Sequence, residues 1–297
     1  MISAVTLTAF TPSNSGSNNY KDLPQFSNAA GGFYFKEKFT MAKKATLPLN
    51  TEREKEFVKT FESLSFRHGS WTVWQDFVTL SACSLSNVLD KRQSVWQKRE
   101  DEYQQTAKKY SETEFQQFIN LLIVTVKALT ENLEQDFLGH LYMHLNFGNG
   151  WTGQFFTPWH VAEMMARMSI GDGMKREVEE KGFISVNDLT CGSGCMLLAF
   201  AQAYRNMFNE SYHQSVLFVG QDIDLVVAKM CYIQLSLMGC AGYVIVGNSL
   251  TKPLTRDVLI PCDDENLWIT PMFFTDIWTT RHLFKAVNFF ERKVENE

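Results

Sequence analysis

From residue 182 onward, strand-like and helix-like segments alternate along the chain. Short apolar runs typical of buried strands occupy residues 182–189, 215–223, 243–248 and 266–270. Apolar residues three and four positions apart, typical of helices, occupy residues 194–208, 225–239 and 280–293. This alternation predicts a parallel, doubly wound sheet with right-handed crossovers, which is a Rossmann-like α/β fold.

The part of the chain before this alternation has a different pattern. Between residues 46 and 148 apolar residues recur at helical spacing, with charged residues on the opposite face, and no proline occurs between residues 49 and 157. We therefore predict a helical N-terminal domain over 46–148. The glycine-rich stretch NFGNGWTG at 146–153 separates it from a shortened α/β domain over 149–297.

Residues 1–45 are dense in Ser, Asn, Gly and Pro, which predicts a disordered arm, and Met41 is as acceptable a start as Met1. The arm lacks the charged and apolar segments of a secretory signal. No apolar run approaches the roughly 18 residues of a membrane span. These observations predict a cytoplasmic protein without a membrane partner.

The cysteines and histidines are the candidate metal ligands of this sequence. Six cysteines in a chain without a secretory signal predict reduced thiols, and Cys191 and Cys195 have no second pair at zinc-finger spacing. His140 and His144 share one face of a predicted helix but lack the glutamate of His-Glu-x-x-His, and Asp136 extends the set too far along the helix. No metal site is predicted.

The net charge is −5, and acidic residues outnumber basic ones after residue 149. A protein that binds nucleic acid alone usually presents a basic face, because neutralisation of phosphates supplies much of the affinity. Any role on DNA therefore requires a partner or a localised basic patch.

The stretch NDLTCGSGC, residues 187–195, lies on the first turn from strand to helix, where ligands bind in doubly wound sheets. It is open to three interpretations: half of a metal site, a reactive thiol, or a ligand-binding turn. Gly192 and Gly194 favour the third, because they let the backbone bend sharply and approach a ligand closely. The N–H groups of the next helix favour a carboxylate, and Asp188 would face an ammonium group. This pair suits the zwitterionic end of S-adenosylmethionine.

Two further segments extend this interpretation. Asp222 follows the second strand in GQDID, where a carboxylate could accept both ribose hydroxyls, and Ile223 could lie against the adenine. A nicotinamide cofactor fits less well, because Leu197 leaves the pattern G-x-G-x-x-G incomplete. Upstream, Thr157 and Pro158 in GQFFTP can cap and open a helix.

The order GQFFTP, DLTCGSG, GQDID and GNSL resembles the adenine-specific DNA methyltransferases related to the modification (M) subunits of type I restriction-modification systems. The likeness covers roughly residues 130–273, beginning with QDFLGHLYMHL. It implies S-adenosylmethionine as cofactor, DNA as substrate, and a specificity or modification subunit as partner. It also implies a set of cofactor-binding residues: Phe156, Thr157, Pro158, Asp188, Thr190, Gly192, Gly194, Asp222, Ile223 and Asn248. Asn248 stands where the family usually has Asp.

Catalysis in that family depends on Asn-Pro-Pro followed by Tyr or Phe, which orients the target amine and stacks on the flipped base. This sequence contains no Asn-Pro-Pro. At the corresponding distance stand Thr270, Pro271 and Phe273, which the resemblance makes the catalytic candidates. Phe273 would stack and Pro271 would shape the turn, while Thr270 offers a hydroxyl in place of the amide. Losing a positioned acceptor costs roughly 100-fold in rate, by analogy with the loss of a catalytic donor.

Three functions remain open at this stage. The first is a DNA adenine methyltransferase with a degenerate catalytic loop, completed by another subunit. The second is a catalytically inactive relative that binds the cofactor or a restriction subunit and acts as a regulator or decoy. The third is a protein that methylates another substrate or binds another nucleotide. The degenerate motif at Thr270 and the short segment after it are the features that separate the first two.

Several aromatic residues surround the predicted site. Trp151, Trp159, Trp268 and Trp278 would either stack on bases or lie in the core, and burial is the commoner outcome. Trp278 and Arg281 are three residues apart at the start of the last predicted helix. They could serve a phosphate or a base, and an ordinary amphipathic helix explains them as well.

Overall fold

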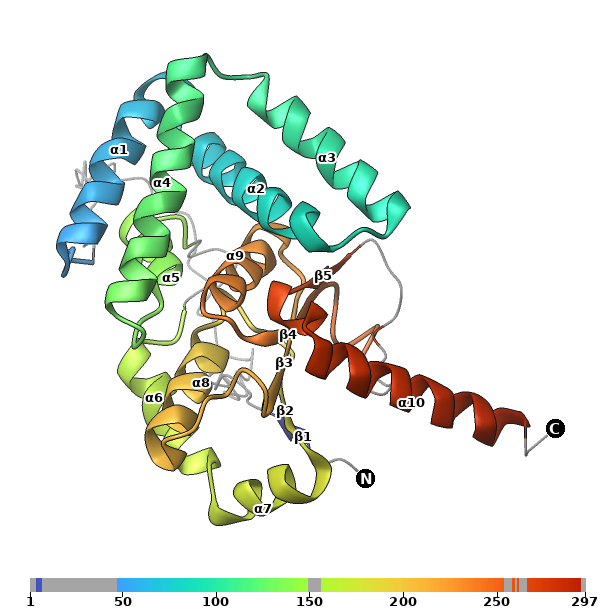
Figure 1. The fold of residues 1–297 in the computed structure, drawn as a ribbon. Helices are drawn as coiled ribbons and strands as arrows, with labels where there is room; N and C mark the ends of the chain where they lie inside the picture. Colours follow the sequence, from blue (N-terminus) through green and yellow to red (C-terminus); the bar gives the residue numbers. More distant parts are fainter. Residues whose placement is uncertain are drawn as a thin grey trace, which may run out of the picture. The chain divides into compact units, whose positions relative to one another are not determined.

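The structure is a computed structural model that describes residues 4–6, 47–148, 156–253, 258–259, 261 and 266–294 (Figure 1). All of these residues belong to one compact unit. At its centre is a five-stranded sheet with the strand order β1-β2-β3-β4-β5. Its strands are β1 (Ala4–Thr6), β2 (Ile184–Asp188), β3 (Val216–Asp222), β4 (Ala241–Val246) and β5 (Leu267–Ile269).

The three strands β2, β3 and β4 run parallel, as the alternating pattern predicted. In their registers Asp188 lies beside Gly220, and Asp222 lies beside Val246. The carboxyl ends of these strands therefore share one edge of the sheet. The predicted α/β fold is confirmed in this part of the chain, and both acidic candidates lie at that edge.

The direction of β5 was predicted incorrectly. β5 pairs with β4 in the antiparallel direction, so that Tyr243 lies beside Ile269 and Ile245 lies beside Leu267. A parallel partner needs a long crossover, usually a helix, and the described residues between β4 and β5 contain none. The sheet is therefore parallel except at this edge, and β5 ends beside the amino ends of its neighbours.

The strand β1 lies within the predicted arm. Its three residues pair in parallel with β2, and Val5 lies beside Val186. An edge strand needs only backbone groups to pair, so its sequence carries little signal. The disordered arm is therefore not observed at residues 4–6, and the rest of that prediction falls on residues outside the described ranges.

Helices cover both faces of the sheet. The helices that follow residue 148 in the chain are α6 (Trp159–Ser169), α7 (Asp172–Lys181), α8 (Cys195–Phe208), α9 (Leu225–Leu237) and α10 (Asp276–Val294). Phe218 and Val244 belong to one core, shared with α8 and α9. Val219 belongs to a second core that also contains Phe273 and Trp278, so α10 covers the opposite face. Figure 1 shows α8 and α9 on one side of the strands and α10 on the other.

Residues 52–144 form the predicted helices. They are α1 (Glu52–His68), α2 (Ser70–Leu89), α3 (Gln93–Ala107), α4 (Glu112–Glu131) and α5 (Phe137–His144). Two of them begin with a capping box, in which Thr51 and Glu54 cap α1 and Ser111 and Glu114 cap α4. Their apolar faces enclose an aromatic cluster in which Trp74 is fully buried.

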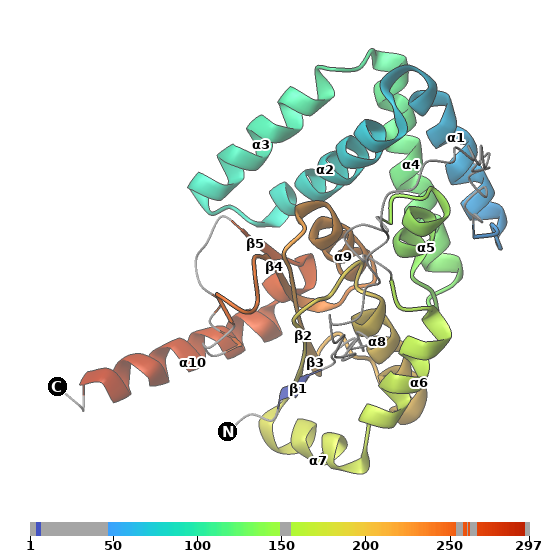
Figure 2. The same ribbon diagram turned by 180° about the vertical axis from the view of Figure 1, so that it is seen from behind.

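The helical region packs directly on the α/β region, with α2 against α9 (Figure 1 and Figure 2). The guanidinium of Arg99 lies 3.9 Å from the centre of the Trp268 indole and donates a 2.7 Å hydrogen bond to the Leu267 carbonyl. The buried amine of Lys229 on α9 pairs with Glu102 on α3 at 2.8 Å. These contacts join the two regions, and a domain boundary between residues 148 and 149 stays a prediction.

The tryptophans near the predicted site that the structure describes are buried or partly buried. Trp268 and Trp278 are buried, Trp159 packs partly buried against the core, and Trp151 lies outside the described residues. Arg281 lies over the Trp278 ring and donates to the Gly182 carbonyl, so the contacts of these two side chains are with other parts of the same chain. Among the described residues, no helix is both long and apolar enough to cross a membrane.

Candidate functional site

The turn between β2 and α8 is held in place by the end of β3. The backbone N–H of Cys191 donates to the Gln221 carbonyl at 2.9 Å, and the N–H of Gly192 donates to the Asp222 carboxylate at 2.9 Å. A further bond from Gly194 N–H to the Cys191 carbonyl, at 2.8 Å, closes the bend. The turn therefore lies at the carboxyl edge of the sheet, as predicted.

Both glycines of the turn are required by its geometry. Gly192 has φ +55° and Gly194 has φ +97°, a region that side chains other than glycine rarely adopt. A Cβ on Gly192 would lie 3.3 Å from the Phe156 ring, and a Cβ on Gly194 would lie 3.0 Å from the sulfur of Cys231. Gly194 is the N-cap of α8 and supplies no side-chain cap. No side chain therefore caps the first turn of α8, which needs acceptors for its backbone N–H groups.

Asp222 accepts two backbone hydrogen bonds at the end of β3. One comes from Gly192 at 2.9 Å and the other from Asp224 at 3.0 Å. Burial raises the pKa of the Asp222 carboxyl, while these backbone donors act in the opposite direction. The next residue, Ile223, is 68% exposed and so is available to lie against a flat ring.

Asp188, at the end of β2, is 1% exposed and accepts a hydrogen bond from the Thr190 N–H at 3.1 Å. Burial raises the pKa of its carboxyl to about 7, and the nearby charge of Asp222 acts in the same direction. Asp188 is buried and Asp222 is partly buried, and raised pKa values at both carboxyls favour a positively charged ligand, because such a ligand stabilises both ionised forms.

The described part of GQFFTP lies against this turn. The Phe156 ring lies where a Cβ on residue 192 would point. The thiol of Cys195 donates to the Thr157 carbonyl at 3.3 Å. Thr157 was expected to cap the next helix. Instead, α6 begins at Trp159, so the residue at its N-cap position is Pro158, which supplies no side-chain cap.

Asn248 follows β4 at the same edge. Its side-chain oxygen accepts the backbone N–H of Leu250 at 2.9 Å, which shapes the turn after the strand. The side-chain oxygen is therefore engaged in its own loop. The role of Asn248 toward a cofactor stays a prediction.

The three catalytic candidates are not brought together with the acids. Because β5 is antiparallel, Thr270 lies beside Cys240 and Gly242, at the amino end of β4. Its hydroxyl donates to the Cys240 carbonyl at 2.7 Å and accepts the Gly242 N–H at 2.9 Å. Thr270 is fully buried, and Pro271 and Phe273 follow in the short 3-10 turn Pro271–Phe274. These residues lie at the opposite edge from the glycine turn.

The sequence did not mark Asp136 as part of this site. Its carboxylate accepts hydrogen bonds from Ser193 at 2.5 Å and from Gln234 at 2.7 Å, and so reaches the glycine turn from the start of α5. Ser193 belongs to TCGSGC, yet the sequence suggested a cofactor-binding role only for Thr190 and the two glycines of that motif. Asp136 followed by Gly139 is a helix-capping signal, which gives no indication of a bond 57 residues away.

The histidine pair predicted to be an ordinary helix edge has separate partners. His140 lies 2.6 Å from Glu54, and His144 bonds the Leu47 carbonyl. In the described parts of the chain, no three His, Cys, Asp or Glu residues are grouped to hold a metal ion. The cysteines that the structure describes are all free and buried.

A model of the N-6 DNA Methylase family matches residues 133–296, which is more than half of the chain. The chain belongs to the N-6 DNA methylase family. The match includes α5 with Asp136, the glycine turn and Asp222, so the whole site lies within the family domain.

This N-6 DNA methylase chain is also similar to curated and solved proteins. The methylase subunit of the type I restriction enzyme MpnII from Mycoplasma pneumoniae is 28% identical over 117 residues, which cover 38% of this chain. That stretch spans 20% of the subunit's length.

Two solved structures are similar at lower identity. One is a proposed class I S-adenosylmethionine-dependent methyltransferase from Listeria monocytogenes, with a TM-score of 0.35 and 12% identity, over 71% of this chain and 58% of that one. The other is a type I restriction-modification methyltransferase subunit from Streptococcus thermophilus, with the same TM-score and identity, over 69% and 60% of the two chains.

Proposed function

We propose that this chain binds S-adenosylmethionine at the carboxyl edge of its sheet. The observation that carries the proposal is the glycine turn flanked by Asp188 and Asp222, each at the end of a neighbouring strand. Asp222 would accept the ribose hydroxyls, and the start of α8, which no side chain caps, would receive the carboxylate of the cofactor.

The chemistry of these residues fits the cofactor. S-adenosylmethionine carries a sulfonium and an ammonium group, and the pKa values of Asp188 and Asp222 are both raised by burial. A cationic ligand would reduce the repulsion between the two carboxylates. Phe156 covers the turn and Ile223 is exposed, so both an apolar wall and a stacking surface are present. When bound, the cofactor supplies the methyl group.

The substrate proposed from family membership is DNA, with transfer to the exocyclic amine of adenine, as part of a restriction-modification system. A partner subunit would supply the contacts to DNA, because the net charge of this chain is −5 and phosphate contacts need basic residues.

A second candidate function is cofactor binding without methyl transfer by the lone chain, which suits a regulator or decoy of restriction-modification subunits. The buried position of Thr270 favours it, because its hydroxyl already bonds Cys240 and Gly242 and lies at the amino end of β4. A target base at the glycine turn would not reach that hydroxyl.

Calorimetric titration with S-adenosylmethionine, together with transfer of a radiolabelled methyl group to mixed-sequence DNA, divides these functions. Saturable binding is expected in the lone chain. Transfer by the lone chain would support the enzyme, and binding without transfer would support the regulator. No binding at millimolar cofactor would contradict the proposal.

The pH dependence of binding tests the role of Asp188. Its pKa of about 7 lies above the ordinary value of 3.8, so the free protein holds a proton there that a cationic ligand expels. Between pH 5.5 and pH 7.0, where an α-amino group stays protonated, the affinity for S-adenosylmethionine should rise with pH. The slope should approach about tenfold per pH unit. Titration in buffers of different ionisation enthalpy measures the released proton.

Asp188→Asn is the control for this experiment, because it keeps the shape and removes the titration. Its affinity should be weaker and nearly independent of pH. The same proton makes the free protein less stable as pH rises from about 4 to about 7, since the folded state holds more protons than the unfolded state in that window. A wild-type affinity that falls with pH would contradict this role.

A further inference from the structure

The Asp136 carboxylate lies where three separate elements meet. One oxygen accepts the Gly139 N–H at the start of α5, at 2.9 Å, and the Gln234 amide of α9, at 2.7 Å. The other oxygen accepts the Ser193 hydroxyl, at 2.5 Å. The first of these bonds is an ordinary helix cap, whereas the other two reach elements that are distant in sequence. Asp136 therefore does more than begin α5.

Ser193 is held from two sides by this network. Its hydroxyl donates to Asp136, and its backbone carbonyl accepts the Gln234 amide at 2.8 Å. Gln234 also accepts the Leu138 N–H at 3.1 Å, so its amide orientation is fixed by donors and acceptors at both ends. Ser193 is 1% exposed and stands between Gly192 and Gly194. Fixing Ser193 therefore fixes the two glycines beside it.

The network also leaves little space. A Cβ at position 139 would lie 2.0 Å from an Asp136 oxygen and 2.5 Å from the Ser193 hydroxyl oxygen, so only glycine lets these groups approach. Burial raises the pKa of the Asp136 carboxyl, which shows that its environment disfavours charge. The three donors act against that cost, which is the condition for keeping a polar group in a core.

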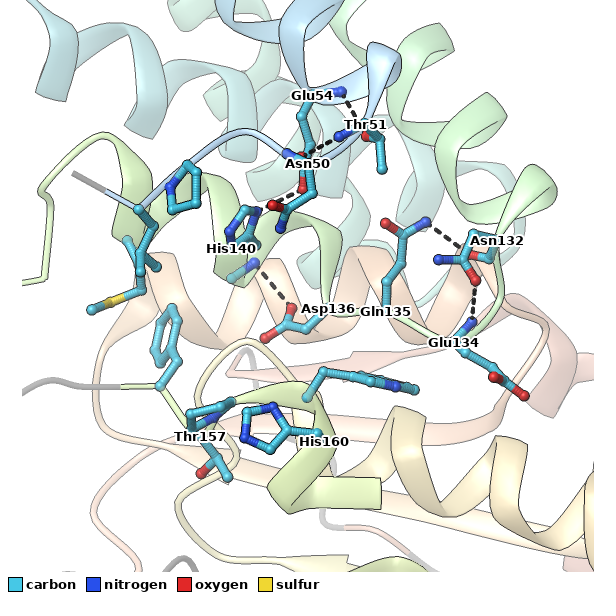
Figure 3. A pocket seen from close by; sticks show the side chains of 17 residues that line it. Asn50, Thr51, Glu54, Asn132, Glu134, Gln135, Asp136, His140, Thr157 and His160 are labelled. Atoms are coloured by element: carbon cyan, nitrogen blue, oxygen red, sulfur yellow. Dashed lines mark hydrogen bonds and ion pairs between the residues drawn. The ribbon is translucent and has the colours of Figure 1, made fainter. Parts of the chain in front are cut away.

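We propose that Asp136 is a positioning residue for the cofactor turn, acting through Ser193 and Gln234. It sets the backbone of Gly192 and Gly194 before any ligand binds, and it does not itself contact the cofactor. This inference rests on the proposed function. Asp136 lines a pocket of about 580 Å³ together with His140 (Figure 3), so the network borders solvent-accessible space on the side of α5.

The test uses two variants and one matched control in the full chain. Ser193→Ala removes only the hydroxyl bond, and Asp136→Asn replaces one carboxylate oxygen by an amide nitrogen, which cannot accept a hydrogen bond. Asp76→Asn is the control, because Asp76 is a buried carboxylate bonded to Tyr110 at 2.7 Å, in the helical region. Three quantities are measured: hydrogen exchange of the amides at 191–195 without cofactor, the Kd for S-adenosylmethionine, and the Tm.

Positioning predicts faster exchange across the turn in both network variants, and a Kd about 10-fold weaker, by analogy with the loss of groups that orient metal ligands. The control should lower Tm without changing either quantity. Unchanged turn exchange in Ser193→Ala and Asp136→Asn would overturn the inference. So would a control that changes exchange and Kd as much as they do.

The exchange measurement separates this inference from the proposed function. If the wild-type chain fails to bind S-adenosylmethionine, the proposed function fails, while faster exchange in the variants still supports the positioning of the turn. If the wild type binds and exchange in the variants is unchanged, the proposed function stands and the positioning role is rejected.

Discussion

Asp222→Ala should strongly weaken the binding of S-adenosylmethionine. The change removes the proposed acceptor of both ribose hydroxyls, and hydrogen bonds to a charged group contribute about 1.5–3 kcal/mol each. It also removes the acceptor of the Gly192 N–H, so the turn loses one of its ties to β3. Together these losses predict an affinity at least about 100-fold weaker, measured by calorimetric titration.

The neighbouring acid supplies the control for this prediction. Asp224 caps α9 through bonds from Val226 at 2.9 Å and Val227 at 3.1 Å. Asp224→Ala should therefore cost about 1 kcal/mol of stability and leave the affinity nearly unchanged. Equal losses of affinity in the two variants would show that acidic charge in general, rather than a contact of Asp222, explains binding. Unchanged affinity in Asp222→Ala would contradict the cofactor site itself.

Gly242→Ala is expected to have the largest effect on stability. A Cβ at this position would lie 1.8 Å from the Phe218 carbonyl oxygen and 2.7 Å from its carbonyl carbon. Both atoms belong to the backbone of β3, so no side-chain rotation relieves the contact. Phe218 and Gly242 are direct partners in the β3–β4 register, and Gly242 also bonds Thr270. The strands would have to separate in the centre of the sheet.

We expect this substitution to cost at least about 4 kcal/mol of the free energy of unfolding, a value typical of severe core disruption. The Tm would then fall by roughly 10 °C or more, or the protein would fail to fold. Thermal unfolding followed by circular dichroism measures the change. Gly173→Ala on α7 is the matched control, since a Cβ there meets nothing within 4 Å, and its Tm should stay the same or rise slightly. A Gly242→Ala melt equal to wild type would contradict the described β3–β4 packing.

The position of Thr270 bears directly on function. In this family the catalytic motif must lie beside the cofactor, whereas Thr270 bonds backbone groups at the amino end of β4. The resemblance placed Thr270 by its distance along the chain. The direction of β5 places it at the other edge of the sheet. Methyl transfer by this chain would therefore depend on groups other than Thr270, Pro271 and Phe273.

Local patterns in the sequence were enough to predict the strands β2 to β5, the helices α8 and α9, and the glycine turn. Apolar periodicity reports whether a segment is helical or extended, and positive φ values at Gly192 and Gly194 are a local requirement that glycine reveals. Since parallel strands end at one edge, the same patterns also brought Asp188 and Asp222 together.

Other features were decided only by tertiary packing. The pairing of β1, the direction of β5 and the bond from Asp136 to Ser193 involve groups that are far apart in sequence. The sequence of a three-residue strand does not reveal the direction in which it pairs. The sequence around a capping aspartate does not reveal a second hydrogen-bond partner. Such features depend on which sheet edges and buried donors remain unpaired once the helices have packed, because nearly every buried polar group must find a partner.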